Sequence, residues 1–481
     1  QERGGHEERP IREEDTMSGQ EGTNTESLIR EERFAVWLSV GVVFLCLLTT
    51  SMLGMVLRSS DEPEAPVEEV APEAISDQRV QEHLESFDIV WSTVNERHWD
   101  PEYLESVGWD AARDELRPRV EQASSDAEAA GVMGELLERL RLSHYQIIPS
   151  AAYDDEVRAG GEGVSGISVR ILDGKPVVFR VAEGSPAEEA GVKPGWIVET
   201  IGERRASDLM DRLAQREAAT GDRPGVISSL VFEAQLTGAV GETLEVGFLD
   251  GEDEPRAVEM VLAESPDPMF EAANLPAMPV HISSSVLDDS VVYFTFSAFM
   301  DPGRLMLQFE RAVNEARDRD GLVIDLRGNV GGIIMLCNGL GGWLLTDTPS
   351  ATLGQLEMRR SDLKLVMNRR ANPLHKPVAV LIDERSISSA EILSGGLKDT
   401  GVARVFGSTS AGMSLPSTVQ NLPNGDRFQF AISNYTSASG RVLEKNGVEP
   451  DVATPLTRVA LLEGRDPAME AALRWIRAQS N

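Results

Sequence analysis

"PVAVLIDERSISSAEILSGGLKD", residues 377–399, contains the pattern that indicates the fold class. Its first part, "PVAVLID", is short, apolar and rich in β-branched residues, which predicts a buried strand. After the polar "ERSISS", Ile392, Leu393 and Leu397 recur at the spacing of neighbouring helical turns, which predicts a helix. The segment therefore reads as a strand, a tight junction and a helix, the repeating unit of an α/β sheet.

Three serines, Ser386, Ser388 and Ser389, lie at this junction. Serine is a good N-cap, so all three could be structural. The N-terminus of a helix also carries free N–H groups and the positive end of its dipole, and both stabilise developing negative charge. From the residues alone, a capping role and a nucleophilic role are equally supported.

A second loop upstream has complementary properties. "GLVIDL" predicts another buried strand, and it ends in "RGNVGG", which contains Gly328, Gly331 and Gly332. Glycine lets the backbone approach a substrate closely. Strands and helices alternate through residues 266–481, which predicts an α/β core, and chemistry in such sheets usually occurs where strands end.

Two further regions precede this core. Leu84, Phe87, Trp91 and Val94 follow a helical period, so residues 79–150 are predicted to form a helical domain. Residues 160–265 contain short alternating runs, a hairpin signal at "LDGK", and the stretch "GSPAEEAGVKPGWIV" (184–198), which predicts a short helix and a Pro-Gly turn before a strand. This second region is predicted to be a β-rich domain.

The first 78 residues have a different character. Residues 1–33 are polar and are predicted to form a disordered tail. "FAVWLSVGVVFLCLLTTSMLGMVL" (34–57) carries no charge and is long enough for a ~30 Å hydrocarbon core, so one transmembrane anchor is expected, with a buried core helix as the alternative. Residues 58–78 form an acidic, proline-rich linker. Arg30 and Arg33 precede the run and only Arg58 closely follows it, which favours a periplasmic or other extracytoplasmic location for the large domain.

Composition excludes several function classes. The formal net charge of −34 argues against nucleic-acid binding. The two cysteines, Cys46 and Cys337, provide no intramolecular disulfide framework, since Cys46 lies in the apolar run. The sequence contains no metal-ligand cluster, phosphate loop or nucleotide fingerprint, so we expect no cofactor and no metal.

The motifs "DERSISSAEI", "DLRGNVGG" and "GSTSAGMSLPS" together resemble the C-terminal processing and tricorn-like serine peptidases. The resemblance implies a ClpP/crotonase-like α/β core. It also implies that Ser388, three residues before Glu391, is the nucleophile, with Ser386 and Ser389 left to a turn and a cap. The oxyanion donors would be the N–H groups of Ser389, Gly331 and Gly332.

Residues 160–265 resemble a PDZ domain, in which "GVSGISV" would receive the C-terminus of a peptide as an added strand. The peptide-binding residues implied by this resemblance are Gly163, Val164, Ser165, Gly166 and Ile167.

The base is less obvious, because the position of the lysine in the processing branch holds Met413, and a thioether cannot take a proton from a hydroxyl. The tricorn-like branch uses a Ser-His pair and an acid, and "SHYQ" and "LEKNGVEPDV" match these with Ser143, His144 and Glu444. Taken alone, His144 could be a helix C-cap and Glu444 a solvated loop acid. Lys398 lies about 15 Å along the helix from Ser388 and is excluded as a base.

We therefore expect a membrane-anchored serine endopeptidase that acts on polypeptides. An inactive, PDZ-containing scaffold that binds peptides is the alternative, and Met413 is the residue that suggests it. A third hypothesis, capture of an apolar ligand by the core, would leave the Ser and His motifs without a role.

Overall fold

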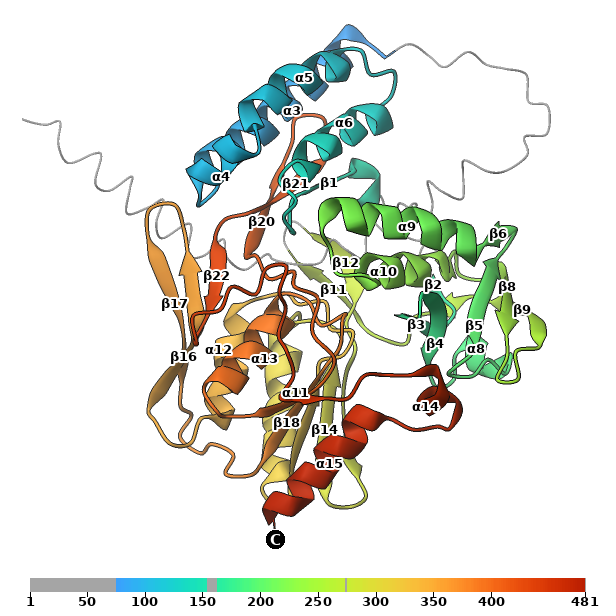
Figure 1. Ribbon diagram of the computed structural model, residues 1–481, viewed down its shortest axis with the longest axis vertical. Coiled ribbons are helices and arrows are strands. Elements are labelled where there is room, and N and C mark those ends of the chain that lie inside the picture. The colour runs from blue at the N-terminus through green and yellow to red at the C-terminus, as the bar shows by residue number, and fades with distance from the viewer. Residues whose placement is uncertain (1–74, 154–161, 273–274, 481) are drawn as a thin grey trace, which may run out of the picture. The chain divides into compact units, whose positions relative to one another are not determined.

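The computed structural model describes residues 75–153, 162–272 and 275–480, all within one unit of the chain, Val40–Asn481 (Figure 1). The expected tail, the apolar run at 34–57 and nearly all of the linker lie outside the described residues. In the described ranges, no helix is long and apolar enough to cross a membrane.

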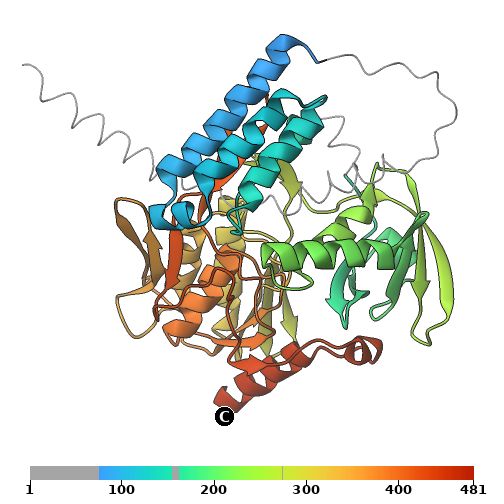
Figure 2. The same ribbon diagram turned by 45° about the horizontal axis from the view of Figure 1, so that its top comes forward.

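The helical module (residues 75–153) packs its helices around one apolar core, in which Phe87, Val90 and Val94 are fully buried (Figure 2). Trp91, which was predicted to share that stripe, is only partly buried. Its helices are α3 (Asp77–Arg97), α4 (Pro101–Ser106), α5 (Trp109–Glu121) and α6 (Asp126–Glu138), followed by β1 (Gln146–Ile148) and the 3-10 turn η1 (Ser150–Tyr153).

A hairpin from late in the chain completes this module. Strand β1 pairs antiparallel with β21 (Arg427–Ala431), which in turn pairs with β20 (Ser417–Asn421). Phe428 and Phe430 of the hairpin enter the apolar core of the helices. The segment that follows α6 is thereby fixed against the C-terminal part of the chain.

The β-rich module (residues 162–264) is built on a sheet with the order β3-β4-β5-β8-β9, in which β3 is an edge strand. The predicted "LDGK" hairpin joins β3 to β4, and "SPAEE" forms the expected short helix α8. The sheet strands are β3 (Ile167–Leu172), β4 (Lys175–Val181), β5 (Ile197–Ile201), β6 (Arg204–Arg205), β8 (Thr243–Leu249) and β9 (Pro255–Val261). A small second sheet contains β2 (Gly163–Val164), β7 (Thr237–Gly238) and β10 (Ala263–Glu264), and the helices are α8 (Pro186–Glu189), α9 (Ala206–Thr220) and α10 (Val226–Gln235).

The core (residues 275–480) contains a six-stranded sheet with the order β13-β14-β15-β18-β19-β23. The pair β13–β14 is antiparallel and all later pairs are parallel, as strand-helix alternation predicts. These strands are β13 (Ile282–Leu287), β14 (Val291–Phe296), β15 (Gly321–Asp325), β18 (Val378–Ile382), β19 (Arg404–Gly407) and β23 (Val452–Ala453).

Helices cover both faces of this sheet, so its central strands are apolar throughout. The helices are α11 (Pro302–Ala316), α12 (Met335–Leu344), α13 (Ser389–Asp399) and α15 (Pro467–Ser480), with a short α14 (Arg458–Leu462). Leu322 and Ile324 of β15 pack with helices α11, α12 and α13, whereas Val323 faces Ala472 and Ile476 of α15. The alternation of side chains along a strand explains this division.

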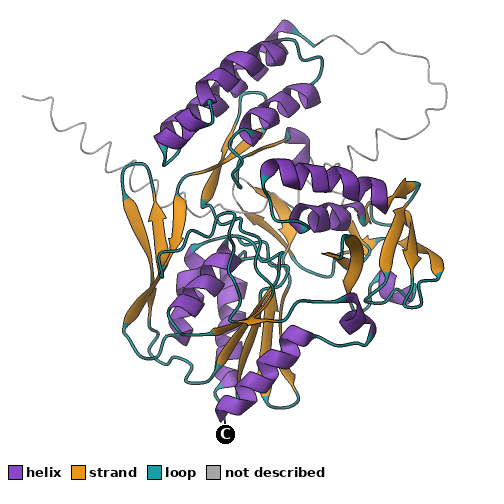
Figure 3. Ribbon diagram, viewed as in Figure 1, coloured by secondary structure: helices purple, strands orange, loops and turns teal. Residues whose placement is uncertain are grey.

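Beside this sheet lie a smaller sheet and a hairpin. The smaller sheet has β16 (Ser350–Glu357) between β17 (Asp362–Asn368) and β22 (Asn434–Ser437), and β11 (Met269–Ala272) pairs with β12 (Leu275–Pro279). Figure 3 shows long loops gathered between the core sheet and the helical module. Two of these loops follow β15 and β18, which are parallel neighbours, so the glycine loop and the serine junction meet at one end of the sheet.

Candidate active site

Ser388 stands between β18 and α13 in a strained conformation. Its φ is 56° and its ψ is −112°, at the N-cap of the helix, and the residue is 2% exposed. A positive φ is costly for a residue with a side chain, and sharp strand-to-helix turns of this kind present nucleophilic serines in hydrolases.

The neighbouring serines have structural partners. The Ser386 hydroxyl donates to the Leu326 carbonyl at 2.8 Å and accepts the Asp383 N–H at 3.0 Å, which fits the expected turn role. The Ser389 hydroxyl donates to the Gly332 carbonyl at 2.8 Å and so ties the junction to the glycine loop. The capping role expected for Ser389 is wrong, because α13 begins at Ser389 and Ser388 occupies the cap position.

The glycine loop lies directly against Ser388. A Cβ atom on Gly331 would come within 2.8 Å of the Ser388 Cβ, so a larger residue would not fit. The Gly331 N–H donates to the Asn329 side chain at 2.9 Å, and the prediction that it is a free oxyanion donor is therefore wrong for this arrangement. In the described part of the chain, the N–H groups of Ser389 and Gly332 have no hydrogen-bond acceptor, which leaves both available.

Ser143, His144 and Glu444 form a buried group, although more than 300 residues of chain separate its ends. The Ser143 hydroxyl lies 2.6 Å from His144 Nδ1 and 2.9 Å from Glu444 Oε2, and the Ser143 N–H donates to Glu444 Oε1 at 2.8 Å. All three residues are less than 9% exposed. Both alternatives left open by the sequence are excluded. Glu444 is buried and is therefore not a solvated acid. His144 lies beyond α6, which ends at Glu138, and so it does not cap that helix.

The hydrogen bonds around His144 assign its tautomer. The Ser143 hydroxyl has one proton, which it donates to the Glu444 carboxylate, and so it accepts the Nδ1–H of His144. The Nε2 atom is then unprotonated and able to accept a proton. Burial lowers the pKa of His144 to about 3, which keeps the imidazole neutral, and burial raises the pKa of Glu444. His144 also has a positive φ of 64°, a strained conformation like that of Ser388.

One loop joins the nucleophile to this group. The N–H groups of Ser388 and Met413 both donate to Glu391 Oε2, at 3.0 and 2.9 Å. The next residue, Ser414, donates its N–H to Glu444 Oε2 at 2.9 Å. These hydrogen bonds, together with the peptide bond between Met413 and Ser414, therefore link the backbone of Ser388 to the carboxylate that contacts Ser143.

The position of the absent lysine is apolar. Met413 is 7% exposed and packs with Ile387, Ala411, Val226 and Leu230, the last two from α10 of the β-rich module. Lys398 points elsewhere, because its Nζ donates to the Glu449 carbonyl and lies 3.5 Å from Asp451. Neither residue can serve as the base.

The predicted peptide site is only partly available. Strand β2 pairs with β10 on one edge and with β7 on the other, so Gly163 and Val164 cannot receive a peptide strand and their prediction is wrong. Strand β3 has a free edge, but the Ile167 N–H donates to the Ser165 hydroxyl at 3.4 Å and the Val169 N–H donates to Glu233 of α10 at 2.8 Å.

Ion pairs connect this edge to the serine junction. Glu233 also pairs with Arg385, and Arg170 of β3 donates to Asp383 at 2.8 Å. Asp383 in turn accepts the N–H groups of Gly328 and Arg385. The edge of the β-rich module and the loop before Ser388 therefore share one buried polar network.

Sequence reasoning missed some of these residues. Glu391 was recognised only as the acid of the S-x-x-E pattern, and Ser410, Ser414 and Glu233 were not considered. The small polar residues of "GSTSAGMS" were the available signal, since buried hydroxyl and N–H groups need acceptors.

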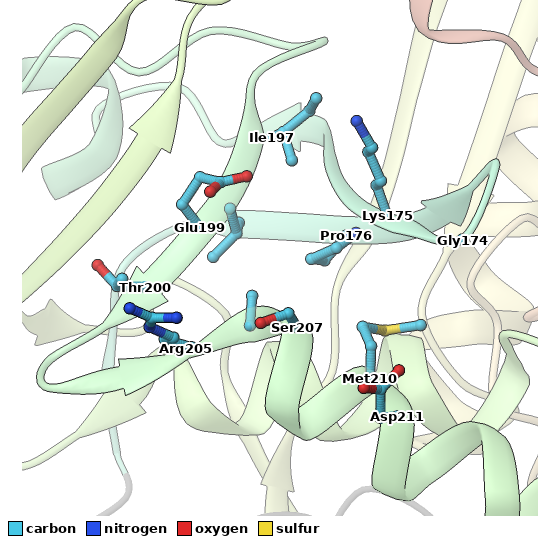
Figure 4. A pocket seen from close by; sticks show the side chains of 12 residues that line it. Gly174, Lys175, Pro176, Ile197, Glu199, Thr200, Arg205, Ser207, Met210 and Asp211 are labelled. Carbon is cyan, nitrogen blue, oxygen red and sulfur yellow. The ribbon is translucent and has the colours of Figure 1, made fainter.

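One cavity lies away from this centre. It has a volume of about 470 Å³ and lies in the β-rich module between β4, β5 and the start of α9. Figure 4 shows the charged groups of Lys175, Glu199, Arg205 and Asp211 around it. None of its lining residues belongs to the loops around Ser388. Within the described ranges, no group of three or more His, Cys, Asp or Glu side chains is placed to hold a metal ion.

Two parts of the chain match known protein families. Residues 290–454 match the peptidase family S41, and residues 79–138 match the C1 domain of tricorn protease. The chain is 27% identical to the carboxy-terminal processing protease CtpB of Bacillus subtilis over 63% of its length and 57% of that of the relative. It is 23% identical to the putative tricorn protease homolog 2 of Streptomyces coelicolor over 82% of its length and 32% of that of the relative. The match thus spans less than two thirds of either relative.

Among solved structures, the photosystem II D1 C-terminal processing protease superposes with a TM-score of 0.52 at 18% identity, covering 83% of this chain and 97% of that one. At this level of identity the likeness concerns the fold. It confirms the mixed α/β, multi-domain architecture expected from the sequence.

Proposed function

We propose that this chain, which belongs to the C-terminal processing and tricorn-like serine peptidases, is a serine endopeptidase with Ser388 as nucleophile and His144 as base. The carrying observation is the shared Glu391 oxygen: it accepts the N–H groups of Ser388 and Met413, and the adjacent Ser414 N–H binds Glu444. These hydrogen bonds support the proposal, because they connect the backbone of Ser388 with the carboxylate that accepts the Ser143 hydroxyl beside His144.

The proposed reaction is acyl transfer followed by hydrolysis. The Ser388 Oγ attacks the carbonyl carbon of the peptide while His144 Nε2 takes its proton. Ser143 and Glu444 stabilise the resulting imidazolium, as the third member of a Ser-His-Asp triad does. The imidazolium then protonates the leaving amine as the C–N bond breaks. In the second step His144 takes a proton from a water molecule, which attacks the acyl carbon, and the imidazolium returns that proton to Ser388 Oγ as the acyl–oxygen bond breaks.

The tetrahedral intermediate carries an oxyanion that needs donors. The N–H groups of Ser389 and Gly332 are the proposed donors, since neither is used within the described residues and Ser389 lies at the positive end of α13. The bond from the Ser389 hydroxyl to the Gly332 carbonyl supports this pairing, because it holds the two loops together.

We propose that the β-rich module binds the C-termini of polypeptide substrates along β3. Support comes from the free edge of β3 and from α10 beside it, the usual elements of strand addition. A bound peptide would have to replace the Glu233 carboxylate at the Val169 N–H. Fluorescence anisotropy with peptides that end in a free carboxylate or an amide tests this, and equal affinity for both would contradict it.

We also propose that residues 34–57 anchor the protein in a membrane, with the catalytic part extracytoplasmic. The support is the uncharged composition of that run and the arginines before it. Extraction of membranes with alkaline carbonate should leave the full chain in the pellet and release a variant that lacks residues 34–57. Release of both would contradict the anchor.

A non-catalytic peptide-binding scaffold is the second candidate, and two observations favour it: Met413 replaces the lysine, and Ser388 is only 2% exposed. Incubation of casein with the full chain and with Ser388→Ala separates the two functions. The peptidase proposal expects cleavage by the wild type alone. An absence of cleavage by both, with peptide binding retained, would support the scaffold.

A further inference from the structure

Glu391, in the first turn of α13, has a carboxylate whose hydrogen-bonding capacity is fully used. Its Oε1 accepts the Ser410 hydroxyl and the Gly412 N–H, both at 2.7 Å. Its Oε2 accepts the N–H groups of Ser388 and Met413, at 3.0 and 2.9 Å. An ionised carboxylate has about four acceptor positions and no donor, so four donors fit the ionised form and leave no place for a proton.

These donors belong to two different parts of the centre. Ser388 carries the nucleophilic hydroxyl on a strained backbone. The other three lie in the loop 410–413, whose Gly412 carbonyl accepts the Lys445 N–H at 2.7 Å, next to Glu444. The Ser410 hydroxyl, in addition, accepts the Val448 N–H at 2.6 Å. One carboxylate thus connects the backbone of the nucleophile with the segment that positions the base.

We propose that Glu391 is a positioning residue whose ionised carboxylate holds the Ser388 backbone and the loop 410–413 in their reactive arrangement, and whose protonation releases them. This inference rests on the proposed function. Glu391 does not contact the substrate, because its two oxygen atoms are enclosed by these four donors and the residue is fully buried. It acts through the geometry of Ser388.

The surroundings of Glu391 place its ionisation in an accessible pH range. Burial raises its pKa to about 7, and its hydrogen bonds oppose this shift. No ion pair involves Glu391 in the described part of the chain, and Lys445 is turned towards Asp222 at 2.8 Å. The nearby ionisable groups, Tyr435 of β22 and Cys337 of α12, stay neutral because burial raises their pKa values.

Under this proposal, the rise in activity near pH 7 comes from Glu391 and not from the base. Burial lowers the pKa of His144 to about 3, so the titration of this imidazole falls well below neutral pH. The ionisation of Glu391 gives the rise in activity. The rising limb of the rate profile, near pH 7, would therefore belong to a residue outside the reacting atoms.

The test compares Glu391→Gln with Glu217→Gln in the full chain. In Glu391→Gln the amide would turn its NH2 group towards N–H donors, with which it cannot form hydrogen bonds. We therefore expect kcat to fall on the order of 100-fold, with KM within about twofold of the wild type. The rise in rate near pH 7 should also disappear. Glu217 is a matched control: it is buried and accepts the N–H groups of Gly225 and Ser228, at 2.9 and 2.8 Å, in the β-rich module. Glu217→Gln should keep the rise in rate near pH 7.

A second measurement does not depend on turnover. Hydrogen exchange of peptides covering 386–391 and 409–414, corrected for the intrinsic effect of pH, should show protection that is lost as the wild type is acidified through pH 7. In Glu391→Gln this protection should be low at every pH. If Glu391→Gln does not fold, the same measurement is made on Glu391→Asp. The inference would be overturned if Glu391→Gln kept the kcat of the wild type and its rise in rate near pH 7. It would also be overturned if the exchange protection of the wild type did not change with pH. Absence of Ser388-dependent cleavage by the wild type would instead refute the proposed function, and exchange alone would then decide on Glu391.

Discussion

In the described part of the chain, two groups of serine, histidine and carboxylate can be compared, and they differ in burial, in geometry and in the segments that form them. In the buried group, Ser143 lies between His144 Nδ1 and Glu444, at 2.6 and 2.9 Å. In the second group, His281 lies between Asp267, at 2.8 Å from Nδ1, and Ser283, at 3.1 Å from Nε2. By contacts alone, the second group is closer to a Ser-His-Asp triad.

The two groups differ in their burial and in the segments that form them. His281 and Ser283 are neighbours at the start of the edge strand β13, and the His281 side chain is 47% exposed to water. The buried group is assembled from two distant segments, and backbone N–H groups of Ser143 and Ser414 fix its carboxylate. A triad of contacts arises easily between i and i+2 on a strand, whereas a preorganised, water-excluded site with oxyanion donors does not. These differences support the proposal that the buried group contains the base, and they make the exposed group a control within the same chain.

The largest expected effect concerns the two serines. Ser388→Ala should lower kcat for cleavage of casein by at least about 10⁴-fold, because it removes the attacking atom. It should also abolish labelling by a fluorophosphonate probe. Ser283→Ala should retain both, since Ser283 has a histidine partner but no buried site. Mapping of the probe to Ser283 by mass spectrometry would reverse the assignment.

A smaller effect is expected at the two acids. Glu444→Gln should lower kcat on the order of 100-fold, because the amide cannot accept from Ser143 and Ser414 together as the carboxylate does, and the tautomer of His144 is then less well fixed. Asp267→Asn should leave kcat within about twofold of the wild type. Comparable losses in both variants would mean that the difference in burial between the two groups has no catalytic meaning.

The smallest effect is on the pH dependence of stability. The pKa of His144 is lower in the fold than its usual 6.5, so its contribution is full above pH 6.5 and is lost as pH falls towards 3. The pKa of Glu391 is raised from 4.5 to about 7, so its contribution is full below pH 4.5 and is lost as pH rises towards 7. Each gives a slope of up to about 1.4 kcal/mol per pH unit.

Urea unfolding from pH 4 to 8 measures these slopes. Relative to the wild type, His144→Ala should lose the increase in stability with pH, and Glu391→Gln should lose the decrease. Parallel curves for all three proteins would show that neither group is buried as described.

Most of the fold could be predicted from local sequence patterns. The strands β14, β15 and β18 and the helices α3, α11 and α15 were predictable, because each has a clear period or a continuous apolar run between turn residues. The hairpin of β16 and β17 was not anticipated, since "EMRRSD" at its turn has no Asn-Gly or similar signal. Helix α9 was also not foreseen inside a region assigned to strands.

The site was predictable where a residue is marked by its own neighbours in sequence. Ser388, His144 and Glu444 were singled out through short motifs, and the structure places His144 and Glu444 on either side of the Ser143 hydroxyl. The use of the Gly331 N–H by Asn329, the pairing of β2 on both edges and the four bonds of Glu391 depend on groups brought together by the tertiary fold. Hydrogen-bond partners of this kind leave no periodicity in the sequence.

We propose that His144, which the helical module contributes, takes the proton of Ser388. The most direct test is the second-order rate constant for phosphonylation of Ser388 by a fluorophosphonate in the wild type, His144→Ala and His281→Ala, read at Ser388 by mass spectrometry. We predict a fall of about 10³-fold or more in His144→Ala, with His281→Ala within about twofold of the wild type. Equal rates in His144→Ala and the wild type would show that His144 does not take the proton of Ser388.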